Sequence, residues 1–150
     1  FPSDAANEQS RTQHALAMLP ALRSGEVIEH SSNSVGWVNW SSDELTHRWS
    51  LGQKSAIVFI ADSQNHASRG LLKIELNTFG EQRVGLQLNG RSIYQGLLQG
   101  RPNRLDVPFD ISVLRSGKNL LEFEVPDATS PGPADPRVLG VAVRSLSVSY

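Results

Sequence analysis

Arg83-Val-Gly-Leu-Gln-Leu-Asn-Gly-Arg-Ser-Ile-Tyr94 is the stretch of this sequence that decides the fold. Apolar and polar side chains alternate over residues 83–88, which is the pattern of a strand with one buried face. Asn89-Gly90 follows directly. A type I′ turn needs two residues at positive φ, a conformation that Asn and Gly adopt at low cost. The stretch therefore predicts an antiparallel hairpin with a two-residue turn.

Short segments on both sides of this hairpin predict further strands. Residues 71–79 alternate with period two, which places Leu72, Ile74 and Leu76 on one face. Residues 56–61 form a compact apolar run suited to a buried strand. Other strands are expected at 27–28, 36–40, 105–109, 118–125 and 138–148, with a single helical turn at 110–114. Roughly eight short strands without a βαβ rhythm predict an all-β, antiparallel β-sandwich of the jelly-roll kind.

The N-terminal residues have a different pattern. Residues 4–22 are typical of one amphipathic α-helix, with Ser3 as its cap and a short apolar stripe toward its end. Pro20 lies inside this stripe, so the helix is expected to end near Leu19. We therefore divide the chain into an N-terminal helix or linker, residues 1–24, and a β-sandwich domain, residues 25–150.

Composition excludes several classes of function. A chain of 150 residues with 14 basic and 15 acidic side chains has a net charge of −1. This argues against general binding to nucleic acid or to an anionic membrane surface, which usually needs a basic excess. No cysteine is present, so disulfides, thiolate metal sites and a cysteine nucleophile are excluded. No apolar run approaches the roughly 20 residues that span a bilayer. Both ends are abrupt, and we expect the chain to be part of a longer protein.

The three tryptophans are the first candidate ligand residues. Trp37, Trp40 and Trp49 lie within a stretch of thirteen residues. Aromatic faces stack on the C–H groups of sugar rings, whereas the alternative is that these indoles fill the core or cover an end of the sandwich. In a regular strand Trp37 and Trp40 would point to opposite faces, so at most one of them is expected to be buried.

Arg48, beside Trp49, is the fourth candidate. Its guanidinium matches a carboxylate or a phosphate on a glycan. The alternative is a structural ion pair with Asp127 or Asp135 in the Pro-rich loop near the end of the chain.

No catalytic or metal-binding motif stands out. The four histidines lack zinc-ligand spacing, and no serine lies in a Gly-x-Ser-x-Gly motif. A glycosidase needs two facing carboxylates, and the sequence singles out no pair among Asp43, Glu44, Asp62, Glu75, Glu122 and Glu124. We predict no catalytic residue, no metal ligand and no cofactor. A structural calcium ion at Asp127 and Asp135 is the alternative.

The last quarter of the chain joins an apolar strand, a Pro-rich loop and a closing strand. The prolines of this loop limit its conformational freedom. Arg137 and Arg144 are candidates to pair with Asp127 and Asp135, which would tie the loop to the sandwich. We expect Arg144→Ala to destabilise the domain, whereas an unchanged melting temperature would favour a ligand role for Arg144.

This segment also carries a resemblance to a known family. Pro126-Asp-Ala-Thr-Ser-Pro131, followed by Asp135-Pro-Arg-Val-Leu-Gly-Val-Ala-Val-Arg-Ser-Leu146, resembles the end of a galactose-binding-like β-sandwich domain. Arg48-Trp49-Ser50 and Thr78-Phe79-Gly80 are similar to its front half. Such domains occur in extracytoplasmic parts of bacterial membrane proteins that build or decorate envelope glycans, of the phosphoglycerol-transferase and multi-spanning glycosyltransferase types. The family commonly has a longer insert where this chain has Gly132-Pro-Ala134.

The resemblance implies a place in the periplasm or on the extracytoplasmic face of the bacterial inner membrane. It favours a non-catalytic accessory domain that binds or positions a glycan or oligosaccharide for an envelope glycan transferase. Trp37, Trp40, Arg48 and Trp49 would be its contacts. The alternative is a purely structural or protein-interaction module that packs on a neighbouring domain of the parent protein. An independent glycan hydrolase or lyase is the third hypothesis. The family's catalytic residues lie in other domains, so the resemblance implies none here.

Overall fold

Strands β7 (Gln82–Leu88) and β8 (Arg91–Leu98) form the hairpin predicted around Asn89-Gly90. The structure is a computed structural model that describes residues 19–62 and 69–150. Asn89 and Gly90 have φ angles of 51° and 84°, as a type I′ turn requires. The side-chain amide of Asn89 also donates through Nδ2 to Asn119 Oδ1 at 2.8 Å, and its Oδ1 accepts from the backbone amide of Leu120 at 2.9 Å. The hairpin prediction is confirmed, and its turn is fastened to the neighbouring strand.

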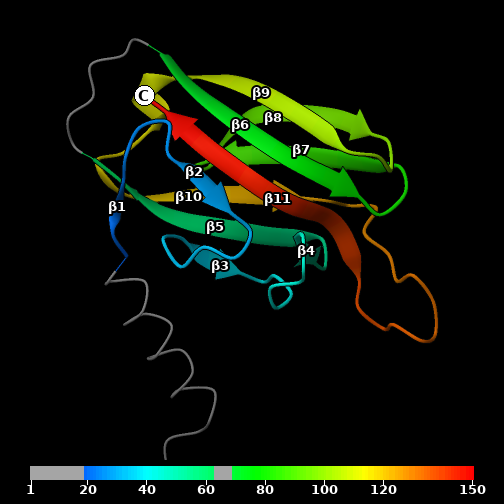
Figure 1. Cartoon of the computed structure of the whole chain (residues 1–150). Helices are drawn as coiled ribbons and strands as arrows, with labels where there is room; N and C mark the ends of the chain where they lie inside the picture. Colours follow the sequence, from blue (N-terminus) through cyan, green and yellow to red (C-terminus); the bar gives the residue numbers. More distant parts are fainter. Residues whose placement is uncertain (1–18, 63–68) are drawn as a thin grey trace, which may run out of the picture.

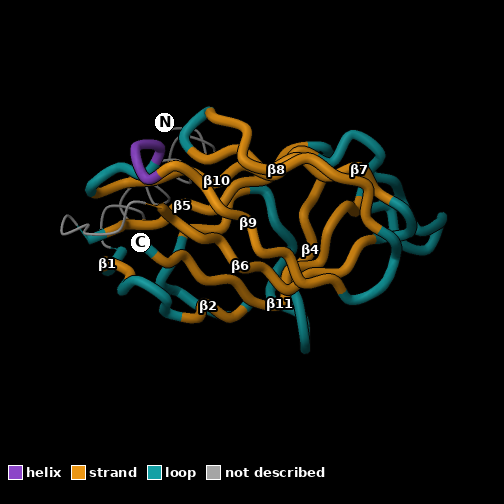
Figure 2. Tube along the Cα trace, turned by 90° about the horizontal axis from the view of Figure 1, so that it is seen from above, coloured by secondary structure: helices purple, strands orange, loops and turns teal. Residues whose placement is uncertain are grey.

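The described residues form two sheets packed face to face (Figures 1 and 2). Sheet A has the order β1 (Ala21–Leu22), β5 (Lys54–Ala61), β10 (Gly117–Glu124), β7, β8, with β3 (Gly36–Val38) also on β5. Sheet B has the order β2 (Val27–Glu29), β11 (Leu139–Ser149), β6 (Arg69–Thr78), β9 (Asn103–Asp110), with β4 (Arg48–Leu51) also on β11. Neighbours are antiparallel except β1 and β5. The all-β sandwich is confirmed.

The core lies between the sheets and follows the predicted alternation. Phe59 on β5 and Phe123 on β10 are 1% and 0% exposed, and they face the apolar side of sheet B. Leu72, Ile74 and Leu76 of β6 are all buried, as their spacing predicts. Burial of each such side chain contributes roughly 1.5–3 kcal/mol, so the period-two pattern sets which face of each strand is internal.

The predicted N-terminal helix is not confirmed. Residues 4–18 of the predicted range 4–22 lie outside the described residues. Ala21–Leu22, at the end of that range, form strand β1, which runs parallel to Ile60 and Ala61 of β5. Leu22 is 3% exposed, so it contributes to the sandwich core from an extended strand and not from a helix face.

Helical structure in residues 19–62 and 69–150 is limited to one 3₁₀ turn. It spans Ile111–Val113, within the helical turn predicted at 110–114, and Asp110 caps it by accepting a hydrogen bond from the Ser112 amide at 2.9 Å. Within those ranges no helix has the length and apolar character that crossing a membrane requires.

The Pro-rich loop is tied down by two arginine–aspartate pairs. Arg83 on β7 donates to Asp127 through Nε at 2.8 Å and Nη2 at 2.7 Å. Arg137 donates to Asp135 through Nε at 2.9 Å and Nη2 at 2.7 Å. The prediction for Arg137 and Asp135 is confirmed, but the partner of Asp127 is Arg83 and not Arg144. Arg83 was not predicted because its position lies 44 residues from the loop.

Gly70 tests the packing between β6 and β9. It pairs directly with Phe109, whose ring lies where a Cβ at Gly70 would be. We expect Gly70→Ala to displace the Phe109 ring and lower the free energy of unfolding by about 1–3 kcal/mol. The matched control is Gly85→Ala on β7, whose Cβ would meet its nearest neighbour at 3.7 Å. Urea denaturation of both variants checks this, and equal stabilities would contradict the packing assignment.

Asp127 gives the loop a pH-dependent attachment. The hydrogen bond from the Arg83 side chain lowers the pKa of Asp127 from 3.8 to about 2. A lowered folded-state pKa means that the stabilisation is complete above the unfolded-state value and is lost as the pH falls toward about 2. We expect Asp127→Asn to lower the melting temperature at pH 7, with the difference from wild type shrinking between pH 4 and pH 2. A difference that stays constant across this range would contradict the assignment.

Candidate functional site

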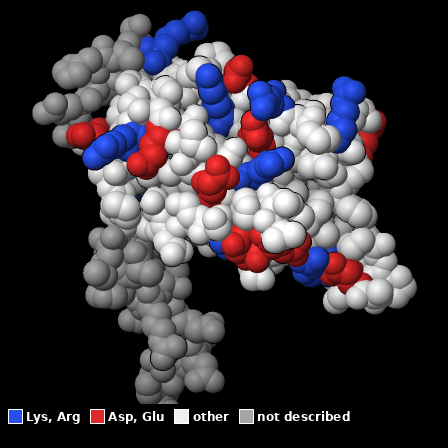
Figure 3. Space-filling view, viewed as in Figure 1, with Lys and Arg blue, Asp and Glu red and all other residues white. Residues whose placement is uncertain are grey.

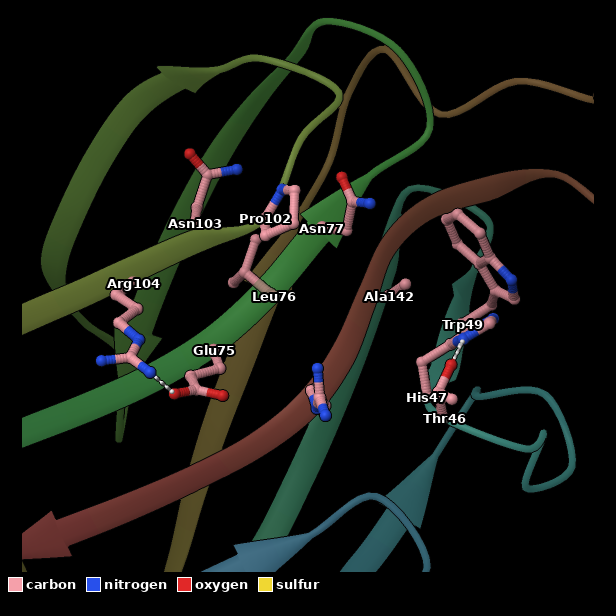
Figure 4. Close-up of a pocket in the computed structure, with 11 residues that line it drawn as sticks. Thr46, His47, Trp49, Glu75, Leu76, Asn77, Pro102, Asn103, Arg104 and Ala142 are labelled. Atoms are coloured by element: carbon pink, nitrogen blue, oxygen red, sulfur yellow. Dashed lines mark hydrogen bonds and ion pairs between the residues drawn. The ribbon is translucent and has the colours of Figure 1, made fainter.

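A row of three residues crosses the outer face of sheet B. Ala142 on β11 pairs with Trp49 on β4 at one edge and with Asn77 on β6 at the other. Directly opposed residues of antiparallel strands point to the same face. The small Ala142 side chain therefore lies between two larger ones, and Figure 4 shows Trp49 and Asn77 on either side of it.

This row forms part of an open groove of about 450 Å³. The volume lies within the range of roughly 300–1,000 Å³ that small-molecule sites have in proteins. Its lining comes from β4, β6, β9 and β11, which are distant in sequence, and it includes His47, Glu75, Arg104 and Arg144. The fold thus assembles one aromatic side chain and several polar ones around a shallow hollow.

Trp49 is held from two sides. His47 and Phe79 both meet its ring edge-on, at centroid distances of 5.3 and 6.3 Å. His47 Nε2 lies 2.9 Å from Glu44 Oε2, and Arg137 donates to Glu44 Oε1 at 2.7 Å. The Arg137 hydrogen bond is the main cause that lowers the pKa of Glu44. The ionised Glu44 therefore links the Pro-rich loop to the aromatic wall of the groove.

Arg144 enters the groove through a β-bulge. Val143 pairs with Leu76 and Ser145 pairs with Glu75, so Arg144 is the extra residue between them. Bulges re-aim side chains and occur often beside functional sites. The Arg144 side chain is exposed and makes no hydrogen bond or ion pair with any residue that the structure describes. The prediction that Arg144 clasps the Pro-rich loop is wrong, because its guanidinium lines the groove instead.

The polar groups of the groove offer donors and acceptors to a ligand. Asn77 Oδ1 accepts from the Thr78 amide at 2.8 Å, and its amide nitrogen has no partner within the described ranges. Arg104 Nη2 lies 3.0 Å from Glu75 Oε1. Figure 3 shows acidic and basic side chains interspersed over this face of the molecule, without a large patch of one sign. The groove therefore suits a polar ligand with many hydrogen-bonding groups.

Trp37 and Trp40 lie elsewhere and contact each other. Their rings meet edge-on at 5.4 Å, and Trp40 also packs on Phe123 at 5.1 Å. Trp40 is 9% exposed and donates to the Ala56 carbonyl at 2.8 Å, so its ring is part of the core and not of a ligand surface. Trp37 is only half-buried, so the expectation that at most one of the two is buried is met. The rings still contact each other, because Asn39 between them has a φ of 62° and interrupts the extended backbone.

Arg48 is also engaged within the protein. Its Nε donates to the His30 carbonyl at 2.9 Å and its Nη1 to the Ser41 carbonyl at 3.2 Å. The guanidinium lies 4.7 Å from the centre of the Trp37 ring, and burial lowers the Arg48 pKa. It pairs with neither predicted aspartate. Of the four residues predicted to bind a ligand, Trp49 is the one that lines the groove.

The groove has no pair of catalytic carboxylates. Glu75 is the one acidic residue among those that line it, and Arg104 holds its Oε1. Asp127 and Asp135, the two candidate calcium ligands, form ion pairs with Arg83 and Arg137 instead. In the part of the chain that the structure describes, no group of three or more His, Asp or Glu is arranged to hold a metal ion.

No protein-family model and no curated protein matches this sequence. Solved structures do match in fold. A family 35 carbohydrate-binding module from Paenibacillus barcinonensis aligns with a TM-score of 0.55 and 13% identity, over 84% of this chain and 99% of that one. One from Clostridium thermocellum gives 0.52 and 10%, over 83% and 99%. A Podospora anserina GH26-CBM35 β-(1,4)-mannanase gives 0.56 and 13%, over 85% of this chain and 28% of that one. This chain therefore has the fold of carbohydrate-binding modules.

Arg144 and Arg137 can be separated by their effect on stability. We expect Arg144→Ala to leave the melting temperature unchanged, because it removes no hydrogen bond or ion pair between the side chain and a described residue. Arg137→Ala is expected to lower the free energy of unfolding by about 1 kcal/mol, because it removes the pairs with Asp135 and Glu44. Thermal denaturation of both variants checks this. A loss of stability in Arg144→Ala that equals that of Arg137→Ala would restore the clasp hypothesis.

Proposed function

We propose that this chain is a non-catalytic module that binds a glycan in the groove on the outer face of sheet B. The observation that carries the proposal is the row Trp49, Ala142, Asn77. In this row the indole of Trp49, which packs against His47, and the side-chain amide of Asn77 lie on either side of the small Ala142. The unpaired guanidinium of Arg144 lies in the same groove. The fold shared with carbohydrate-binding modules supports the proposal.

The chemistry of the groove suits a sugar. A pyranose ring can lay its C–H groups against the Trp49 face, which buries apolar surface on both partners. The free amide of Asn77 can donate to a hydroxyl group. Arg144 can donate to hydroxyls and binds more strongly to a carboxylate or phosphate substituent, because such hydrogen bonds are charge-assisted. Ala142 supplies the space that the ring occupies.

We further propose an extracytoplasmic location, where the module positions glycan for an envelope glycan transferase in the same parent protein. The support is the sequence resemblance of residues 126–146, together with residues 48–50 and 78–80. Within this proposal the transferase chemistry belongs to other domains. The module raises the local concentration of glycan near them through its tether.

Trp49→Ala tests the proposal on a glycan array and by tryptophan-fluorescence titration. The array holds neutral glucans and glucans that carry uronic-acid or phosphoglycerol groups. We expect the wild-type chain to bind at least one class and Trp49→Ala to weaken that binding roughly 30-fold or more, as truncation of a central aromatic contact does. Arg144→Ala is a second variant, and its effect should be largest for acidic glucans.

The matched control is Leu97→Ala, which removes an apolar side chain 56% exposed on sheet A. It should bind as the wild type does. Millimolar oligosaccharide that neither binds nor quenches the wild-type chain would refute glycan binding. Equal losses in Trp49→Ala and Leu97→Ala would place the binding site outside this groove.

A further inference from the structure

A second, smaller cavity of about 180 Å³ lies next to the groove on the same face of sheet B. Glu75 and Arg104 line both cavities. The second cavity continues past this ion pair to Lys73, Ser147 and other residues of β2, β6, β9 and β11. Alone it is smaller than the roughly 300 Å³ at which small-molecule sites begin, so it is better understood as an extension of the groove.

Strand register shows that the two cavities have the same cross-section. Ser147 on β11 pairs with Val27 on β2 at one edge and with Lys73 on β6 at the other. Ala142 has the same position between Trp49 and Asn77. In both rows a small β11 side chain lies between two larger neighbours, which makes β11 the floor.

The two cavities together form one trough with β11 as its floor, and the walls of this trough are continuous as well. β6 pairs with β11 from Val141 to Ser149 and so occupies one edge throughout. β4 and β2 must therefore share the other edge, as Figure 1 shows. Trp49 forms this wall at one end of the trough, and Val27, which is 61% exposed, forms it at the other.

The trough is longer than one sugar ring. From Asn77 to Lys73 on β6 is four residues, or about 13 Å along the strand. Arg144 lies at the bulge between the two rows and lines the groove, with no ion-pair partner among the described residues.

The Glu75–Arg104 pair at the boundary does not close the trough. The two side chains are 39% and 84% exposed. Exposed pairs of this kind contribute little to stability, so they can exchange their contact for a ligand at small cost. A carboxylate and a guanidinium then offer an acceptor and donors to hydroxyl groups.

We infer that the site takes an internal run of linked sugars lying along β11, and not a single terminal sugar. This inference rests on the proposed function and specifies its ligand as an extended glycan chain. The sugar on Trp49 is the anchor, and the following sugars cross the Glu75–Arg104 pair toward Lys73 and Asp106, which pair across β6 and β9 and line the second cavity.

Calorimetric titration with oligomers of graded length tests the inference. The probes are cello-oligosaccharides and oligogalacturonates of one to six residues, as neutral and acidic chains. For the class that binds, affinity is expected to rise roughly tenfold or more from the monosaccharide to the tetramer, as one or two added hydrogen bonds would give. The double variant Lys73→Ala, Asp106→Ala should lose this gain and bind monosaccharide as the wild type does.

A matched control is Lys118→Ala, which removes an exposed lysine from β10 in sheet A. It should keep the full length dependence. A monosaccharide that binds as tightly as the hexamer, with no effect of the double variant, would overturn the extended-chain inference while leaving glycan binding in place. Failure of every probe to bind the wild-type chain would overturn both.

Discussion

The pairing of β11 along both of its edges is the constraint on which the rest of the structure depends. β6 holds one edge, and β4 and β2 hold the other in succession. With both edges paired, the inner face of β11 can bury Val141 and Val143 completely. Its outer face is left with small side chains between taller neighbours. The same strand therefore provides the centre of sheet B and the floor of the groove.

The bulge at Arg144 allows β11 to bury apolar side chains on its inner face both before and after this residue. Val141 and Val143 point inward before it, and Leu146 and Val148 point inward after it. A regular strand cannot bury both pairs, because its inward positions fall on every second residue. One extra residue restores the alternation, and Arg144 is that residue. The break in the apolar pattern of residues 141–148 is visible in the sequence, and it could have identified both the bulge and the exposed arginine.

Local chemistry was predictable from the sequence, and long-range partners were not. The Asn89-Gly90 hairpin and the buried face of β6 follow from turn geometry and period two, which act over a few residues. Period two did not predict the contact between the Trp37 and Trp40 rings, because Asn39 between them has a positive φ and interrupts the strand. The charge of Arg48 predicted an ion pair with an aspartate, but its guanidinium contacts backbone carbonyls and the Trp37 ring instead. Those partners are set by the packing of distant segments, which no local pattern encodes.

The Pro-rich loop connects sheet A to the aromatic wall of the groove. Asp127 fastens it to β7 of sheet A through Arg83. Arg137 connects it through Glu44 and His47 to the ring of Trp49 on β4 of sheet B. A side chain held by packing before a ligand arrives loses little conformational entropy when the ligand binds. Under the proposed function, the loop therefore contributes to glycan recognition without touching the glycan. Its prolines have the same effect, because they restrict the segment that orients the aromatic wall.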